Sequence, residues 1–461
     1  MVANRWKILH IVNIGTFMST LDVGIVNVAL PTMAEQFGVS LAHVQWVVTC
    51  YLLTMVALLP LMGRLSDAVG RHYIYSGGFL VFAIGSLYAA FAGGLTGIVI
   101  ARCVQGIGAT MIMANSQAMV RQIFPDEERG RALGFNAVII SIGTLSGPAV
   151  GGLLLGVTGW EWLFLLNIPF GIAGFVFGLK WFPKIRQAVT ARLDLAGSLM
   201  LAASAVLLML ASEGSGGAID VWWLIAGGLC LLAIFAIYEV WIKDGILDRE
   251  LFTKRSIVIG NISAFVIHLV QMGSLIPITF YFQHQLGFSP WLTGLVLCIQ
   301  PLLMGIAAPY GGTYRDRYGA FVPLFAGPIT AALSMAVVVL APAGSAVAMS
   351  LQLGLFGIAM GLFQSTNNAE IMSAAPDHKI SHMGSMLALI RYMGMIAGTG
   401  IAAAFVGDLG GGGASSAFLE SAQMHTRLQW LFAVCLVMSL AVSGLAMLRP
   451  RRRVQEEQLQ A

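Results

Sequence analysis

The sequence predicts an all-α polytopic membrane protein with fourteen transmembrane helices. Apolar residues make up 58% of the 461-residue chain, charged residues only 10%, and the mean hydropathy is +0.84. A soluble globular protein carries about 25% charged residues. The apolar residues form runs of about 20, the length that an α-helix needs to cross a bilayer, and the basic residues gather in alternate loops. Together these observations exclude a soluble protein.

Polar loops separate the apolar runs, whose edges follow from composition. The runs lie near 8–31, 44–63, 73–93, 96–119, 133–155, 161–182, 193–211, 220–242, 257–283, 291–311, 321–341, 345–366, 384–407 and 428–448. The first run is longer than the apolar core of a signal peptide and lacks a small-residue cleavage site, so it is expected to remain in the protein. The five cysteines are scattered singly, without the spacing of a metal or disulfide framework.

The basic residues orient the chain. Alternate connections contain almost all of them: Arg5, Lys7, Arg64, Arg71, Arg121, Arg129, Arg131, Lys184, Arg186, Arg192, Lys243 to Arg255, Arg315, Arg317, Lys379 and Arg449 to Arg453. Arg427 falls on the opposite side. Because Lys and Arg concentrate on the cytoplasmic side, both termini are expected there, in a cytoplasmic (inner) membrane. The formal charge of +4 therefore reflects topology and gives no indication of a nucleic-acid partner.

Two segments repeat one glycine–aspartate spacing. Gly63, Asp67 and Gly70 recur as Gly312, Asp316 and Gly319, an offset of 249 residues (312 − 63). The alternative is a chance match in a chain with 54 glycines. Paired halves around a midplane site are typical of secondary transporters. The repeat predicts six-helix bundles at 1–182 and 251–461, with two extra helices in 183–250.

Asp22 lies deep in the first apolar run. A charge at that depth costs a few kcal/mol or more unless it is paired, neutralised or hydrated. At 1.5 Å per residue, Asp22 and Arg102 both lie about 21 Å above the cytoplasmic edge of a ~30 Å core, so they are able to pair. Arginine favours the charged carboxylate and burial favours the neutral acid. Movement between these environments would couple proton binding to conformation; the alternative is a static ion pair.

Glycines mark a close helix contact in the run 133–155. Gly143, Gly147 and Gly151 recur every four residues and present one smooth face, beside Gly152. Pro148 removes a backbone donor and is expected to kink this helix. The segment is read either as simple close packing or as a bendable interface helix, and the two readings are compatible.

Other polar or soft residues within the runs are candidates for substrate contact. They are Met18, Asn27, Gln105, His268, Gln271, Gln300, Arg391 and Tyr392. The repeat offset places the neutral Gln271 opposite Asp22. A lone membrane histidine is more often a satisfied interhelical hydrogen-bond partner. Arg391 is expected to bind an anionic substrate group or to pair with Glu370, whereas Asn367 and Glu370 themselves suit a polar helix end.

Four motifs, in order along the chain, resemble the major facilitator superfamily, specifically its fourteen-helix drug:proton antiporter branch. They are Leu21-Asp22 with Ile25 to Pro31, the loop Gly63 to Arg71, Arg102 with Gln105 to Ala109, and Gly143 to Gly152; the stretch Trp160 to Pro169 is also similar. The resemblance covers the whole chain. Gly24 departs from it, because a threonine is usual there, and Ala68 and His72 stand where basic residues are usual.

The resemblance implies a proton-coupled antiporter that exports small amphipathic compounds by alternating access. Asp22 and Arg102 would couple protons, and a cytoplasmic gate would comprise Gly63, Asp67, Gly70, Arg71 and Asp316. The expected partners are a small-molecule substrate, protons and the bilayer, and the expected state is a monomer without metal, cofactor or nucleic acid.

Three other functions remain open. The first is a dedicated exporter of an endogenous anionic or zwitterionic metabolite, lipid or siderophore. The others are a membrane-embedded enzyme and a non-transporting receptor. Clustered metal or catalytic ligands, as such an enzyme needs, are not evident, and no phosphate-binding Gly-Lys-Ser/Thr loop is present.

Overall fold

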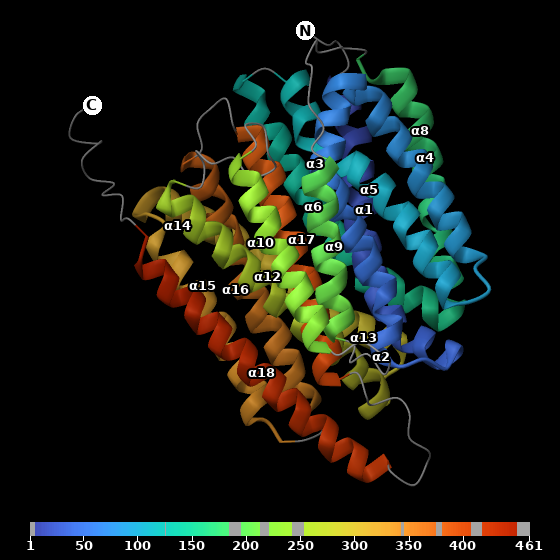
Figure 1. Ribbon diagram of the computed structural model, residues 1–461, viewed down its shortest axis with the longest axis vertical. Helices are drawn as coiled ribbons and strands as arrows, with labels where there is room; N and C mark the ends of the chain where they lie inside the picture. Colours follow the sequence, from blue (N-terminus) through green and yellow to red (C-terminus); the bar gives the residue numbers. More distant parts are fainter. Residues whose placement is uncertain are drawn as a thin grey trace. The chain divides into compact units, whose positions relative to one another are not determined.

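The computed structural model is helical throughout the part of the chain that it describes, with no β-strand there (Figure 1). The described residues are 5–124, 126–183, 195–212, 221–241, 253–342, 345–374, 380–406 and 417–449. They group into two compact units. The first contains Met1–Ile246 and Phe288–Leu295, and the second contains Leu247–Gly287 and Val296–Ala461.

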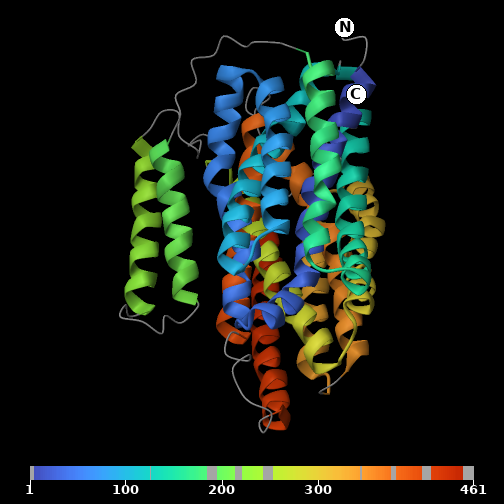
Figure 2. The same ribbon diagram turned by 90° about the vertical axis from the view of Figure 1, so that its right-hand side faces the viewer.

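The first unit is built around its N-terminal helix. Its elements are α1 (Arg5–Phe37), α2 (Leu41–Val44), α3 (Trp46–Val69), α4 (Arg71–Ala90), α5 (Leu95–Ile123), α6 (Asp126–Val157), α7 (Glu161–Leu165), α8 (Asn167–Trp181), α9 (Leu195–Ser212), α10 (Val221–Trp241) and most of α13 (Pro290–Leu297). Helix α1 packs along α6 and also contacts α5 and α8. Helices α9 and α10 pair with each other (Figure 2), and α9 also contacts α3.

The second unit pairs its helices in a similar way. Its elements are α12 (Arg255–Phe280), the π-helix η1 (Tyr281–Gln285), α14 (Ile299–Tyr318), α15 (Phe321–Leu340), α16 (Ala346–Ala374), α17 (Ile380–Val406) and α18 (Ala417–Met447). Helix α12 packs along α17, and α16 packs against both α14 and α15.

Each predicted apolar run coincides with a helix or a pair of short helices, which confirms an all-α polytopic fold. Among the described residues, ten helices are long and apolar enough to cross a membrane, and three shorter apolar helices accompany them. The number fourteen and the cytoplasmic termini stay predictions. The basic positions 184, 186, 192, 243, 249, 379 and 451–453 lie outside the described residues. Helix α16 continues past its apolar run to Ala374, because its polar end finds partners on neighbouring helices.

The repeated motif has the same backbone form in both units. Gly70 has φ +118° and donates its N–H to Ser66 O at 2.9 Å. Gly319, 249 residues later, has φ +92° and donates to Arg315 O at 2.9 Å. Positive φ of this kind favours glycine. Each glycine therefore ends one helix and permits an abrupt turn into the next.

The position of Asp67 corrects one expectation. The motif Gly63 to Arg71 is expected to be a loop, which would place Asp67 between two helices. Instead it belongs to the last turn of α3, and Gly70 alone separates α3 from α4. Asp316 likewise lies in the last turn of α14. The turn needs only one residue because Gly70 adopts the positive φ; the Asp67 side chain lies outside the described part of the chain.

Gly63 has open surroundings. Glycine in a membrane helix often permits close approach of a neighbouring helix, yet no described atom of another element lies within 4 Å of a Cβ built at Gly63. We therefore expect Gly63→Ala to preserve stability or to raise it slightly, because alanine suits a helix interior better than glycine. Gly70→Ala should destabilise by about 1–3 kcal/mol, because alanine is strained at its φ. Thermal unfolding of the two variants in detergent checks this, and equal melting temperatures would contradict it.

Candidate functional site

A buried ion pair lies within the first unit. Arg102 Nη1 on α5 donates to Asp22 Oδ2 on α1 at 2.5 Å. Both side chains are sealed from solvent, with exposures of 0% and 1%. The structure thus forms the pair that the depth estimate allowed. Each charge compensates the other where an isolated one would be costly.

Further contacts of Arg102 tie several helices to this pair. Its Nε donates to Val47 O on α3 at 2.8 Å, and Nη1 also donates to Gln105 Oε1 at 2.9 Å. The guanidinium lies 4.2 Å from the centre of the Tyr51 ring, a cation–π contact. Gln105 in turn donates to Ser86 Oγ on α4 at 2.7 Å. A change at Arg102 therefore affects α1, α3, α4 and α5 together.

Asn167 completes the surroundings of the carboxylate. It is the first residue of α8, fully buried, and its Nδ2 donates to Asp22 Oδ1 at 3.0 Å. Leu166 separates α7 from α8, so Asn167 begins α8, which packs against α1. Asn167 was not among the candidate residues predicted from the sequence. The available signal was an amide two residues before a proline, in an otherwise apolar run.

Glycines bring α6 unusually close to α1 beside the pair. A Cβ at Gly147 would lie 2.8 Å from Gly24 Cα, and a Cβ at Gly151 would lie 3.0 Å from Ile25 O. A Cβ at Gly143 would overlap the Thr20 hydroxyl. Gly24 itself would place a Cβ 3.0 Å from Gly147 Cα. A side chain there would require the α6 backbone to move by a few tenths of an ångström, so glycine suits this contact better than the usual threonine.

Gly152 faces a different neighbour. A Cβ built at Gly152 would lie 2.6 Å from Pro290 O in α13, within the first unit. Pro148 lies inside the continuous helix α6, and Gly294 of α13 packs against its carbonyl. The glycines of this motif therefore serve two contacts, with α1 and with α13.

In the first unit, the other candidate residues are buried. Met18 and Asn27 lie in the packed part of α1. Gln105 is held between Arg102 and Ser86, so the structure places it in the ion-pair network.

In the second unit, the candidates are spread over three helices. His268 Nδ1 lies 2.7 Å from Ala264 O in its own helix, α12, so its bond is local and not interhelical. Gln300 is buried in α14, and Gln271 is half-buried in α12. Arg391 on α17 lies 5.0 Å from the centre of the Tyr392 ring.

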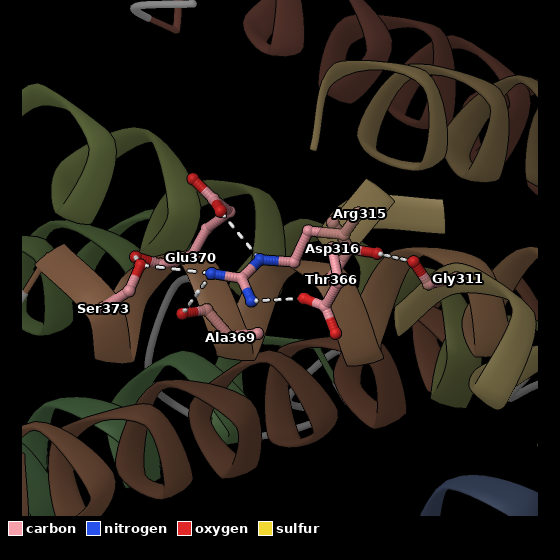
Figure 3. A network of polar contacts seen from close by, with 7 residues as sticks. All are labelled: Gly311, Arg315, Asp316, Thr366, Ala369, Glu370 and Ser373. Carbon is pink, nitrogen blue, oxygen red and sulfur yellow. Dashed lines mark hydrogen bonds and ion pairs between the residues drawn. The ribbon is translucent and has the colours of Figure 1, made fainter. Parts of the chain in front are cut away.

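A second ion-pair network lies at the end of α14 and α16 (Figure 3). Arg315 Nε donates to Glu370 Oε1 at 2.8 Å, and Arg315 Nη1 donates to Asp316 Oδ1 at 3.0 Å. Arg315 Nη2 also reaches Ser373 Oγ at 3.4 Å. The expected pairing of Glu370 with Arg391 is therefore wrong: Arg315 projects from the neighbouring α14 onto Glu370, whereas Arg391 lies on α17.

Arg449 extends these contacts just beyond α18. Its Nη2 donates to Asn367 Oδ1 at 2.6 Å, and Asn367 Nδ2 donates to Gly260 O on α12 at 3.1 Å. Burial lowers the pKa of Arg449 to about 10, and the Glu370 carboxylate opposes that shift. Arg449 therefore remains charged at neutral pH. The polar end expected for α16 therefore joins this helix to α12 and to Arg449, which follows α18.

Comparison with known proteins agrees with this architecture. Residues 12–399 match the family model of the Major Facilitator Superfamily. The riboflavin transporter RibZ of Clostridioides difficile (strain 630) is 34% identical over 403 residues, covering 87% of this chain and 88% of its own. The putative multidrug resistance protein MdtD of Escherichia coli O7:K1 is 32% identical over 445 residues, covering 94% and 93%.

A solved structure shares the fold. It is the crystal structure of a bacterial homologue of the human lysosomal transporter Spinster, inward-facing and unoccupied, with a TM-score of 0.67, 14% identity and 97% of each chain covered. The family and the fold are those of multi-pass membrane transporters of small molecules and not of enzymes. The chain therefore belongs to the Major Facilitator Superfamily.

Proposed function

We propose that this transporter is a proton-coupled antiporter of the cytoplasmic membrane that exports small amphipathic compounds by alternating access. The buried Asp22–Arg102 pair supports the coupling, because a carboxylate in that position is able to hold a proton or an arginine contact. The similarity to MdtD, named as a putative multidrug resistance protein, supports the substrate class.

The proposed cycle exchanges one ion pair for one bound proton. A proton that binds the Asp22 carboxylate makes it neutral, so its attraction for Arg102 falls while Arg102 keeps its charge. Arg102 also contacts α3 and, through Gln105, α4. Weakening one contact therefore alters the packing of several helices. Release of the proton restores the pair and returns the transporter to its first state.

The remaining assignments belong to the same proposal. Gly63, Asp67, Gly70, Arg71 and Asp316 would form a cytoplasmic gate, and Gly143 to Gly152 would form a flexible contact helix. The protein would act as a monomer, with six-helix bundles at 1–182 and 251–461 and a two-helix insert at 183–250. The similar positive-φ turns at Gly70 and Gly319 support the two-fold organisation.

A second candidate is a dedicated exporter of one metabolite. The 34% identity to a riboflavin transporter favours a polar heteroaromatic compound. The half-buried Gln271 and buried Gln300 offer amide groups suited to such a molecule. Arg391, whose contact is with the Tyr392 ring, would favour an anionic substrate group instead. The substrate panel below separates these possibilities.

The test is substrate-induced proton release in proteoliposomes, comparing wild type with Asp22→Asn. The panel contains lipophilic cations, zwitterions, anions and riboflavin. We expect wild type to couple flux to protons and Asp22→Asn to lose the coupling, because an amide cannot exchange the proton. Glu161→Gln, which neutralises an acid on α7, should retain it. Unchanged proton dependence in Asp22→Asn would overturn the assignment.

A further inference from the structure

The buried amide of Asn167 has one satisfied and one unsatisfied end. Its Nδ2 donates to Asp22 Oδ1 at 3.0 Å, whereas its Oδ1 has no hydrogen-bond partner among the described residues. A buried polar atom without a partner is uncommon and calls for an explanation. Asn167 sits opposite Arg102, so the two oxygens of Asp22 are held by different helices, α8 and α5.

We propose that Asn167 is a positioning residue that stabilises both protonation states of Asp22. In the ionised state the Asn167 N–H donates to Asp22 Oδ1, as observed. When a proton binds that oxygen, the carboxylic acid becomes a donor and the amide N–H no longer suits it. Rotation of the Asn167 amide by about half a turn presents its Oδ1 as the acceptor, since the carbonyl and amino ends of this side chain exchange places.

This arrangement keeps Asp22 in place when its attraction for Arg102 weakens. The proton resides on Asp22 Oδ1, Arg102 keeps its charge, and no other group changes its protonation. Without Asn167, the neutral acid would be free to leave the site and the ionised acid would lose one of its two donors. The inference rests on the proposed proton coupling at Asp22 and adds the residue that holds it.

Among the residues that the structure describes, few other titratable groups face Asp22. Helix α5 brings Arg102, with the Cys103 thiol near it, and α3 brings the Tyr51 ring against that guanidinium. At this level α6 brings glycine to the α1 backbone, and the described residues of α8 around Asn167 are apolar. The pH dependence of the site should therefore respond to Asn167 and to Arg102.

The experiment measures the pH profile of proton-coupled transport for two near-isosteric variants. Asn167→Leu removes both the donor to the carboxylate and the acceptor for the neutral acid. The bond to the ionised carboxylate is charge-assisted and the stronger of the two, so the ionised state loses more and the midpoint should move up by about one pH unit. Asn167→Asp removes the donor and adds a like charge, so its midpoint should move at least as far upward. Both variants should keep substrate binding at low pH, where Asp22 is neutral.

Asn136→Leu is the matched control. Asn136 is also buried and donates its amide to a residue of α1, Asn13 Oδ1, at 2.8 Å. Asn136→Leu should lower the stability of the protein without moving the midpoint of the pH profile of transport. Uniformly reduced transport with an unmoved midpoint in both Asn167 variants would show a structural role only and overturn the inference. If Asp22→Asn remains proton-coupled, the proposed function itself fails, whatever Asn167 does.

Discussion

Replacing Arg102 with methionine is expected to destabilise the protein by about 3–5 kcal/mol and to abolish proton-coupled transport. Methionine keeps much of the apolar volume but leaves the buried Asp22 carboxylate without its cation. It also removes the donors to Val47 O and to Gln105, which join α3 and α4 to the pair. Thermal unfolding of purified protein in detergent, with transport in proteoliposomes, measures both losses.

The double variant Asp22→Asn with Arg102→Met is the control for this loss. It removes both charges, so it should recover much of the stability that the single Arg102 variant loses, because removing both partners of a buried pair is far less costly than removing one. Transport should stay uncoupled. A single Arg102→Met variant as stable as wild type would contradict the buried pair.

The second large effect is expected at the glycine contact between α1 and α6. A Cβ at Gly147 would lie 2.8 Å from Gly24 Cα and 3.0 Å from Leu21 O. Both are backbone atoms, which have little freedom to move aside. We expect Gly147→Ala to destabilise by about 1–3 kcal/mol. It should also reduce transport at every pH, because a wider α1–α6 separation displaces Asp22, next to Leu21.

Gly156→Ala is the matched control on the same helix. Its Cβ would lie 3.6 Å from Trp291 Cβ, an ordinary contact, so stability and transport should not fall. Yield of monodisperse protein, melting temperature and initial transport rate compare the two variants directly. Equal behaviour of Gly147→Ala and Gly156→Ala would show that α6 does not depend on this close contact.

Composition and motif spacing determined the class and order of the helices. A run of about 20 apolar residues has few options in a bilayer other than a helix, because its backbone polar groups must be satisfied within the segment. The offset of 249 residues was sufficient to equate the turns at Gly70 and Gly319. Helical rise alone placed Asp22 and Arg102 at one depth, since depth depends only on position along each helix.

Contacts between helices followed only from the tertiary structure. The pairing of Glu370 with Arg315, the open surroundings of Gly63 and the bond from Asn167 to Asp22 each depend on which helix lies opposite. Residue spacing specifies the face that a side chain occupies on its own helix, but not the neighbour that the face meets. That neighbour is selected by packing among all the helices, where glycines permit close approach and bulkier side chains prevent it.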